Sequence, residues 1–279
     1  MIDYLPTALT VVAFALHVLG ERRAVVRTGR PRDRQARSRA LMFYAGLLTI
    51  LVALQSPLDS LADQLFWAHM IQHLLLLVVA APLIVLGRPW RSIWRPLPLR
   101  LRRPLARTVL RSPAFAPVRA VGGVLGSAPA AWFLFNLGLV LWHMPGPYDR
   151  TLENIDVHVL EHTTFLLCGI VFWAQVAGCP PAARALSYGA RIVYLAGAMV
   201  VNVGLSIYLA YAQHALYSPY AQLAHRPGGI SALADQQIGA GLMWTAGDMP
   251  FVLAIAVLVQ RWLAGHEAMP APVGGTAEV

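Results

Sequence analysis

The chain has 279 residues, of which 57% are hydrophobic and only 13% are charged, and its mean hydropathy is +0.57. A sequence this apolar is atypical of a water-soluble domain of the same length, so the composition indicates an integral membrane protein. The formal net charge of +9 does not indicate nucleic acid as a partner, because the positive charges are confined to loops and do not cover a folded polar surface.

Seven apolar segments approach the roughly 20 residues that an α-helix needs to cross a bilayer. The first of them has no basic region before it and no small-residue cleavage site after it, so we expect a retained helix and not a signal peptide. In chain order, the predicted transmembrane helices cover residues 5–20, 40–54, 63–87, 122–142, 153–178, 184–212 and 235–263. The predicted fold is therefore all-α, a bundle of about seven transmembrane helices in one domain, residues 1–267. A tail dominated by Pro, Gly and Ala, residues 268–279, is expected to be disordered.

The segment between the third and fourth predicted helices is rich in proline and arginine. Residues 89–117 contain six prolines, and proline interrupts regular helices. We therefore expect an irregular or interfacial loop on the cytoplasmic side.

The arginines predict how the chain is oriented in the membrane. All 22 basic residues are arginines, and seventeen of them lie in two stretches, residues 22–39 and 88–119, in the first and third loops. The loops predicted on the opposite side hold only Arg150 and Arg226. Because cytoplasmic loops of membrane proteins retain positive charge, we expect the N-terminus outside and the C-terminus in the cytoplasm.

This orientation places six of the nine histidines near the outer face. These six are His69, His73, His143, His158, His162 and His214. They include two pairs with a spacing of four residues, His69 with His73 and His158 with His162, and residues i and i+4 lie on the same face of a helix. Two neutral imidazoles placed in this way can hold one ion of zinc, copper, iron or nickel. For His17, His225 and His266 we expect ordinary surface or interfacial roles.

Two carboxylates and two methionines accompany these histidines. Glu161 lies between His158 and His162 in the chain, and Asp248 lies in the middle of the last predicted helix. Ionisable groups inside a membrane are costly and usually face the bundle interior, where a carboxylate can bind a metal or orient a ligating histidine. The thioethers of Met70 and Met144 favour cuprous copper, although methionine also fills helix interfaces.

The sequence thus predicts a metal site near the outer face. The expected ligands are His69, His73, His143, His158, His162 and Asp248. Glu161, Met70 and Met144 are expected to surround them. The alternative for each histidine taken singly is a hydrogen bond between two helices, without a metal.

Four motifs in order carry a resemblance to a known family. They are PLDSLADQLFWAHMIQHLLLLVVAAPLIVLGRP, LWHMPGPYD, HVLEHTTFLLCGIVFW and GLMWTAGDMPF, spread between residues 41 and 263. Together they resemble the multi-spanning CtaG-type cytochrome c oxidase assembly factors of bacteria. The family's histidine motifs match the five ligating histidines predicted above, and its late aspartate matches Asp248.

The resemblance implies a seven-helix protein of the bacterial plasma membrane that is needed to mature a haem-copper oxidase. A mechanism consistent with the residues is that copper at the outer face is held by these histidines and then handed to an oxidase subunit in the membrane, without any enzymatic step. The expected partners are the lipid bilayer, subunits of a terminal oxidase and a protein that donates copper.

Two other functions remain compatible with the same residues. An intramembrane zinc hydrolase would use three histidines around zinc, which lowers the pKa of bound water to about 7, with Glu161 or Asp248 as the general base. A haem-b-binding membrane protein would use histidines of two helices as axial ligands.

Overall fold

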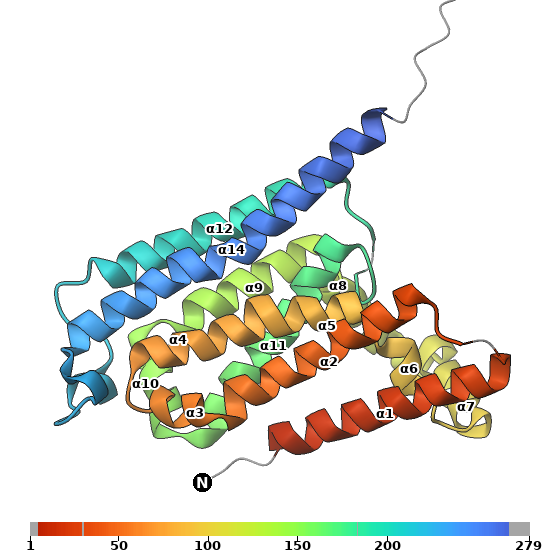
Figure 1. Ribbon diagram of the computed structural model, residues 1–279, viewed down its shortest axis with the longest axis horizontal. Helices are drawn as coiled ribbons and strands as arrows, with labels where there is room; N and C mark the ends of the chain where they lie inside the picture. Colours follow the sequence, from red (N-terminus) through yellow and green to blue (C-terminus); the bar gives the residue numbers. More distant parts are fainter. Residues whose placement is uncertain (1–4, 30, 183, 268–279) are drawn as a thin grey trace, which may run out of the picture.

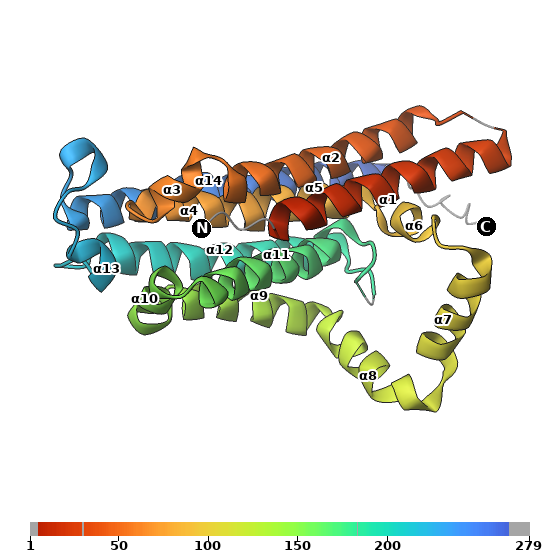
Figure 2. The same ribbon diagram turned by 90° about the horizontal axis from the view of Figure 1, so that it is seen from below.

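The structure is a computed structural model that describes residues 5–29, 31–182 and 184–267. Over these residues the chain forms helices and helical turns and no β-strand, which confirms the predicted all-α class. The longer helices run side by side in an elongated bundle, and one excursion projects from an end of it (Figures 1 and 2). The tail predicted to be disordered, residues 268–279, lies outside the described residues.

The chain contains both longer helices and short ones. The helices of nine or more residues are α1 (Leu5–Thr28), α2 (Arg34–Gln55), α4 (Phe66–Leu74), α7 (Leu99–Arg111), α8 (Ala116–Leu125), α9 (Ala128–Trp142), α10 (Pro145–Glu153), α11 (Ile155–Ala177), α12 (Tyr188–Ala210) and α14 (Ala232–Glu267). The shorter ones are α3 (Pro57–Ala62), α5 (Ala81–Gly87), α6 (Trp90–Trp94) and α13 (Ser218–Ala221), with a π-helical stretch η1 (Leu75–Ala80) and single turns η2 (Pro113–Phe115) and η3 (Pro227–Gly229).

Five helical segments are long and apolar enough to cross a membrane. They are Arg34–Gln55, Phe66–Gly87, Ile155–Ala177, Tyr188–Ala210 and Ala232–Ala264. A sixth span results if Pro113–Leu125 and Ala128–Trp142, which meet at 73°, are counted as one broken span. The chain is therefore a multi-pass membrane protein with five or six candidate spans. The predicted number of seven is reached only by adding α1, which does not meet the same criterion because charged residues occupy its C-terminal part.

The segment Phe66–Gly87 is the centre of the bundle. It consists of α4, η1 and α5 in direct succession, and α2, α11 and α14 pack against it. Most of its side chains are buried, among them His69, Gln72 and His73. The π-helical stretch begins two residues after His73, and such stretches are frequent at functional sites.

Two glycines allow neighbouring helices to approach this central segment closely. A Cβ on Gly169 of α11 would lie 2.9 Å from the Ala81 side chain, and one on Gly239 of α14 would lie 2.4 Å from Cδ1 of Phe66. Any larger residue would push the helices apart, so both glycines set the distances at which polar side chains of different helices meet.

A buried carboxylate fixes the start of the central segment. The Asp235 carboxylate on α14 accepts hydrogen bonds from the backbone amides of Phe66 and Trp67, at 2.9 and 3.0 Å. Helix N-termini have unpaired amides and a positive dipole end, and α4 has no capping side chain of its own. Asp235 therefore supplies the missing cap and ties α14 to the helix that carries His69 and His73.

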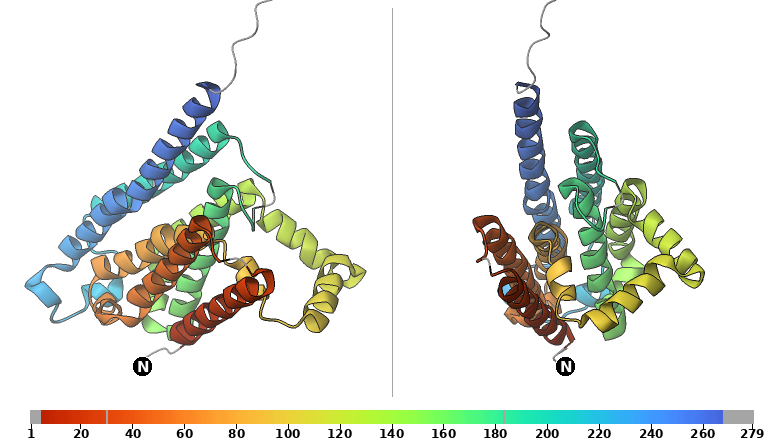
Figure 3. Two further views of the ribbon diagram at one scale, coloured as in Figure 1. Left: turned by 45° about the vertical axis from the view of Figure 1, so that its right-hand side comes forward. Right: turned by 90° about the vertical axis from the view of Figure 1, so that its right-hand side faces the viewer.

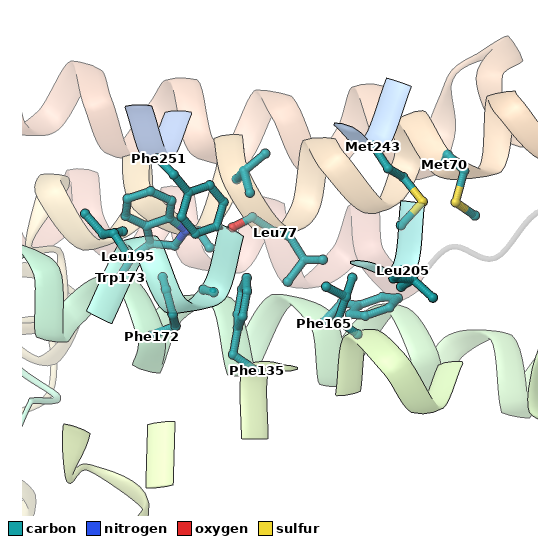
Figure 4. Close-up of a cluster of buried hydrophobic side chains, with 14 of the residues drawn as sticks. Met70, Leu77, Phe135, Phe165, Phe172, Trp173, Leu195, Leu205, Met243 and Phe251 are labelled. Atoms are coloured by element: carbon teal, nitrogen blue, oxygen red, sulfur yellow. Dashed lines mark hydrogen bonds between the residues drawn. The ribbon is translucent and has the colours of Figure 1, made fainter. Parts of the chain in front are cut away.

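Aromatic side chains fill the bundle beyond the histidines (Figure 4). The Phe135 and Phe172 rings stack at 4.1 Å between centroids, and Phe251 packs across them from α14. The indole nitrogen of Trp173 donates to the Leu77 carbonyl at 2.9 Å, a carbonyl within the π-helical stretch. Helices α12 and α14 lie side by side along this core (Figure 3). The core thus holds α11 and α14 against the central segment.

The proline- and arginine-rich segment is helical and not irregular. It contains α6, which packs against α1, and then α7, η2 and α8, which project from the bundle end (Figure 2). Proline is tolerated in the first turn of a helix, and Pro113 and Pro117 occupy that position in η2 and α8. The arginines and leucines of α7 are exposed or only partly buried, as in helices that lie at a membrane surface.

Candidate metal centre

Four buried side chains meet between α4 and α11. They are His69 and His73 of α4 and Glu161 and His162 of α11, which we call the four-residue centre. Each offers one ligand atom, these atoms lie within 4.8 Å of one another, and no member is more than 6% exposed. Three imidazoles and a carboxylate form a ligand set suited to zinc or copper.

The Glu161 carboxylate lies between the two histidines of α4. Its Oε2 is 3.3 Å from Nε2 of His69, and its Oε1 is 3.4 Å from Nε2 of His73. Neither contact has hydrogen-bond geometry, and the described residues provide no other partner for these four atoms or for Nε2 of His162. Buried polar atoms are normally paired, so their convergence here fits a cation held at the centre.

A tyrosine from a distant loop orients His69. The Tyr220 hydroxyl donates to the Ala62 carbonyl, so it can accept a hydrogen bond from Nδ1 of His69, which lies 3.3 Å away. Burial raises the pKa of Tyr220, which keeps this hydroxyl protonated. With the proton on Nδ1, His69 presents the Nε2 lone pair to Glu161 and His162, the arrangement usual for a metal-binding histidine.

His158 lies beside the centre and faces a cavity. Its ring centroid is 4.2 Å from that of His162 and 5.2 Å from that of His69, and its Nε2 is buried with no hydrogen-bond partner. His158 and His162 line a cavity of about 270 Å³ between α1, α2 and α11. The rest of the lining is mostly apolar, with Gln55 and Asp59 at one side. The cavity therefore reaches the edge of the four-residue centre.

The other predicted metal-site residues are placed differently. His143 packs against His73, with 5.6 Å between ring centroids, but lies outside the four-residue centre. The Asp248 carboxylate accepts a hydrogen bond of 3.0 Å from the Asn202 amide, which joins α14 to α12. Met144 is partly buried at the start of α10. These residues are thus not brought together with the four, and their roles as ligands stay predictions.

The histidines expected to have ordinary roles lie apart from the centre. His225 is exposed, as is His214, which shares the predicted outer side. His17 is buried elsewhere, where its Nδ1 is 3.1 Å from the Tyr44 hydroxyl. The side chain of His266 lies outside the described residues.

Sequence reasoning missed Tyr220 and gave Glu161 only a supporting role. The spacing does contain the signal for Glu161, because residues 158, 161 and 162 share one helical face. No local signal identifies Tyr220, which reaches His69 from 151 positions away in the chain.

The fold and the centre define a multi-pass helical membrane protein with a buried histidine and carboxylate cluster that could hold a metal ion. The sequence pattern of one protein family, described as cytochrome c oxidase caa3 assembly factor (Caa3_CtaG), matches residues 15–265. The chain belongs to this family.

Relatives were also found among curated mycobacterial proteins. The chain is 25% identical to an uncharacterized protein of Mycobacterium bovis and to one of Mycobacterium tuberculosis, over 226 residues in each case. It is 25% identical over 228 residues to an uncharacterized protein of Mycobacterium leprae. Each alignment covers 80% of this chain but only 34% of the relative, so the chain spans about a third of the length of these proteins. No solved structure matches the chain.

Proposed function

We propose that this protein binds copper and aids its insertion into a haem-copper cytochrome c oxidase, without being an enzyme itself. The observation that carries the proposal is the four-residue centre, in which the Nε2 atoms of three histidines and both oxygens of a carboxylate are buried without hydrogen-bond partners. Membership of an oxidase assembly family supports copper as the metal and oxidase subunits as partners. A protein that donates copper is the further partner that such a role requires.

The route to the centre supports a carrier. His158 lines the cavity beside His162 of the four-residue centre, and its Nε2 is buried without a hydrogen-bond partner. Copper that is to be handed on needs ligands that exchange, and a histidine beside the centre can take over the ion during its release. Asp248 and His143 could join the four-residue centre as ligands only if the helices rearrange when the metal binds.

The membrane and the orientation belong to the same proposal. We assign the protein to the bacterial plasma membrane with its N-terminus outside, because the arginine-rich loops would then be cytoplasmic. Figure 2 supports a separation of the two sides, since α10 lies at one end of the bundle and α7 at the other. The four-residue centre would then open toward the outer half of the membrane.

Cysteine labelling tests this orientation. In a variant that lacks Cys168 and Cys179, single cysteines at Arg34 and Arg103 should react with an impermeant thiol reagent only from the cytoplasmic side. A cysteine at Asp149 should react in intact cells. The reverse pattern would contradict the orientation and the outer-face position of the centre.

A zinc hydrolase of membrane lipids is the second candidate. The apolar cavity of about 270 Å³ beside His158 and His162 favours it, because an acyl chain would fit such a lining. Glu161 would then serve as the general base for a zinc-bound water.

Metal analysis combined with an absorption spectrum separates the candidates. Protein purified in mild detergent should contain copper near one equivalent or more and show no Soret band. Stoichiometric zinc together with hydrolysis of added lipid would identify the hydrolase. A Soret band would identify a haem-b-binding protein, and either of these results would overturn the copper proposal.

A further inference from the structure

A second pair of metal-binding atoms lies next to the four-residue centre. It consists of Nε2 of His143, at the end of α9, and the sulfur of Met70 on α4, which are 3.3 Å apart. Both residues are fully buried, with exposures of 1% and 0%. Neither belongs to the four-residue centre.

The hydrogen bonds of His143 fix which nitrogen carries its proton. Its Nδ1 is 2.7 Å from the Leu139 carbonyl, which can only accept a hydrogen bond, so Nδ1 must be the donor. In the neutral imidazole the other nitrogen, Nε2, then carries no proton and has a free lone pair. The position of the ring is held further by the Tyr217 hydroxyl, which donates to the His143 carbonyl at 2.9 Å.

The contact between Nε2 and the sulfur therefore joins two electron-pair donors. A thioether has no proton to give, so no hydrogen bond can form between a neutral His143 and Met70. A second proton on His143 would make the ring a buried cation, and its Nε2 would then donate only to the sulfur of Met70, a weak acceptor. Burying a charge in this way is costly. A metal ion that binds both atoms satisfies them together.

The separation of the two atoms fits a shared ion. With bond lengths of about 2.0 Å to nitrogen and about 2.3 Å to sulfur, as for zinc, two ligands at a tetrahedral angle are about 3.5 Å apart. The observed 3.3 Å is close to this value. Little movement of either side chain is needed for both to bind one ion.

A small cavity adjoins this pair. Its volume is about 20 Å³, and its lining includes His143 and Met70 together with Met243 and His73. A space of roughly 10–15 Å³ suffices for one water molecule, so one ion fits. Figure 4 shows Met243, from α14, next to Met70. A second thioether is therefore available to the same ion.

We propose that His143, Met70 and Met243 form a second metal site that selects cuprous copper. Thioether ligands favour Cu(I), whereas zinc prefers imidazole, thiolate and carboxylate. The proposal extends the copper role proposed above, but its ligands are independent of those in the four-residue centre.

His73 links the two sites. It lines the small cavity and is also a member of the four-residue centre. Its ring centroid is 5.6 Å from that of His143 and 5.4 Å from that of His162. Copper held by soft ligands can thus pass to the imidazole and carboxylate ligands through one shared side chain, by exchange of ligands and without crossing apolar space.

Competition with a chromophoric Cu(I) chelator tests the second site. The full-length protein, reduced and free of oxygen, should take up more Cu(I) equivalents than Zn(II) equivalents. Met70→Leu, which keeps the side-chain volume, should lower the affinity for the additional Cu(I) at least tenfold and leave Zn(II) uptake unchanged. X-ray absorption of the Cu(I)-loaded protein should show sulfur scattering that weakens in this variant.

A matched control and a second variant keep the outcomes distinct. Met199→Leu makes the same change at a partly buried methionine of α12 that belongs neither to the four-residue centre nor to the lining of the small cavity, and it should behave like the unmodified protein. Unchanged Cu(I) affinity and unchanged sulfur scattering in Met70→Leu would overturn the second site. If His69→Ala loses its copper while Met70→Leu keeps it, only the second site fails. If Met70→Leu alone loses copper, the second site stands and the four-residue centre is not the copper site.

Discussion

Replacing His73 by Ala is expected to lower the metal content of the purified protein more than any other single histidine substitution. His73 belongs to the four-residue centre and also lines the cavity beside His143 and Met70. Loss of a residue that merely supports a ligand costs roughly 10- to 100-fold in metal affinity, so removal of a ligand should cost at least as much. His69→Ala and His162→Ala should each lower the metal content as well. His158→Ala should have a smaller effect, since His158 lies beside the centre.

The control for these variants is His225→Ala, which removes an exposed histidine and should retain the full metal content. Equilibrium dialysis followed by elemental analysis gives the occupancy, and the thermal unfolding midpoint shows whether each variant is folded. Full metal retention by both His73→Ala and His162→Ala would show that these residues pack helices together and are not metal ligands.

The helices themselves were predictable from local sequence. Apolar length identified all five of the segments that are single candidate spans, because a bilayer imposes a minimum length on each span. It did not identify the break before α4, where Asp235 from the other end of the chain supplies the cap. A cap provided by a tertiary contact leaves no signal in the sequence near residue 66.

The candidate site was predictable where helical spacing alone brings side chains together. The pair His69 and His73 and the trio around Glu161 each lie on one helix, so their spacing predicts a shared face. Which helices then meet depends on packing, for example at Gly169 and Gly239. Asp248 shows the limit of prediction from spacing. A carboxylate inside the membrane can bind a metal or, as here, accept a hydrogen bond from the Asn202 amide.

The proline-rich segment shows a second limit. Prolines were expected to interrupt helices between residues 89 and 117, yet Pro113 and Pro117 occupy first turns, where the missing amide has no cost, and Pro104 lies inside α7. Composition alone does not distinguish a proline that ends a helix from one that begins it.

Cells without this protein are expected to insert oxidase polypeptides into the membrane that contain little copper and have little activity. The expectation rests on the proposed copper role together with membership of the oxidase assembly family. Excess copper in the medium should restore part of the activity, because a higher free concentration compensates by mass action for the loss of a carrier. Oxygen consumption with alternative oxidases blocked, and the copper content of the isolated oxidase, measure the effect.

Three strains distinguish the mechanisms behind such a loss. The His73→Ala strain should resemble the deletion even at normal expression, since the bundle would be present without its ligand, whereas the His225→Ala strain should resemble the parent. Lost assembly that copper does not restore would indicate a purely structural chaperone, contrary to the proposal. Altered membrane lipids with an intact oxidase would indicate the zinc hydrolase instead. Normal oxidase activity in the deletion strain would exclude an assembly role, because no step of oxidase maturation would then depend on this protein.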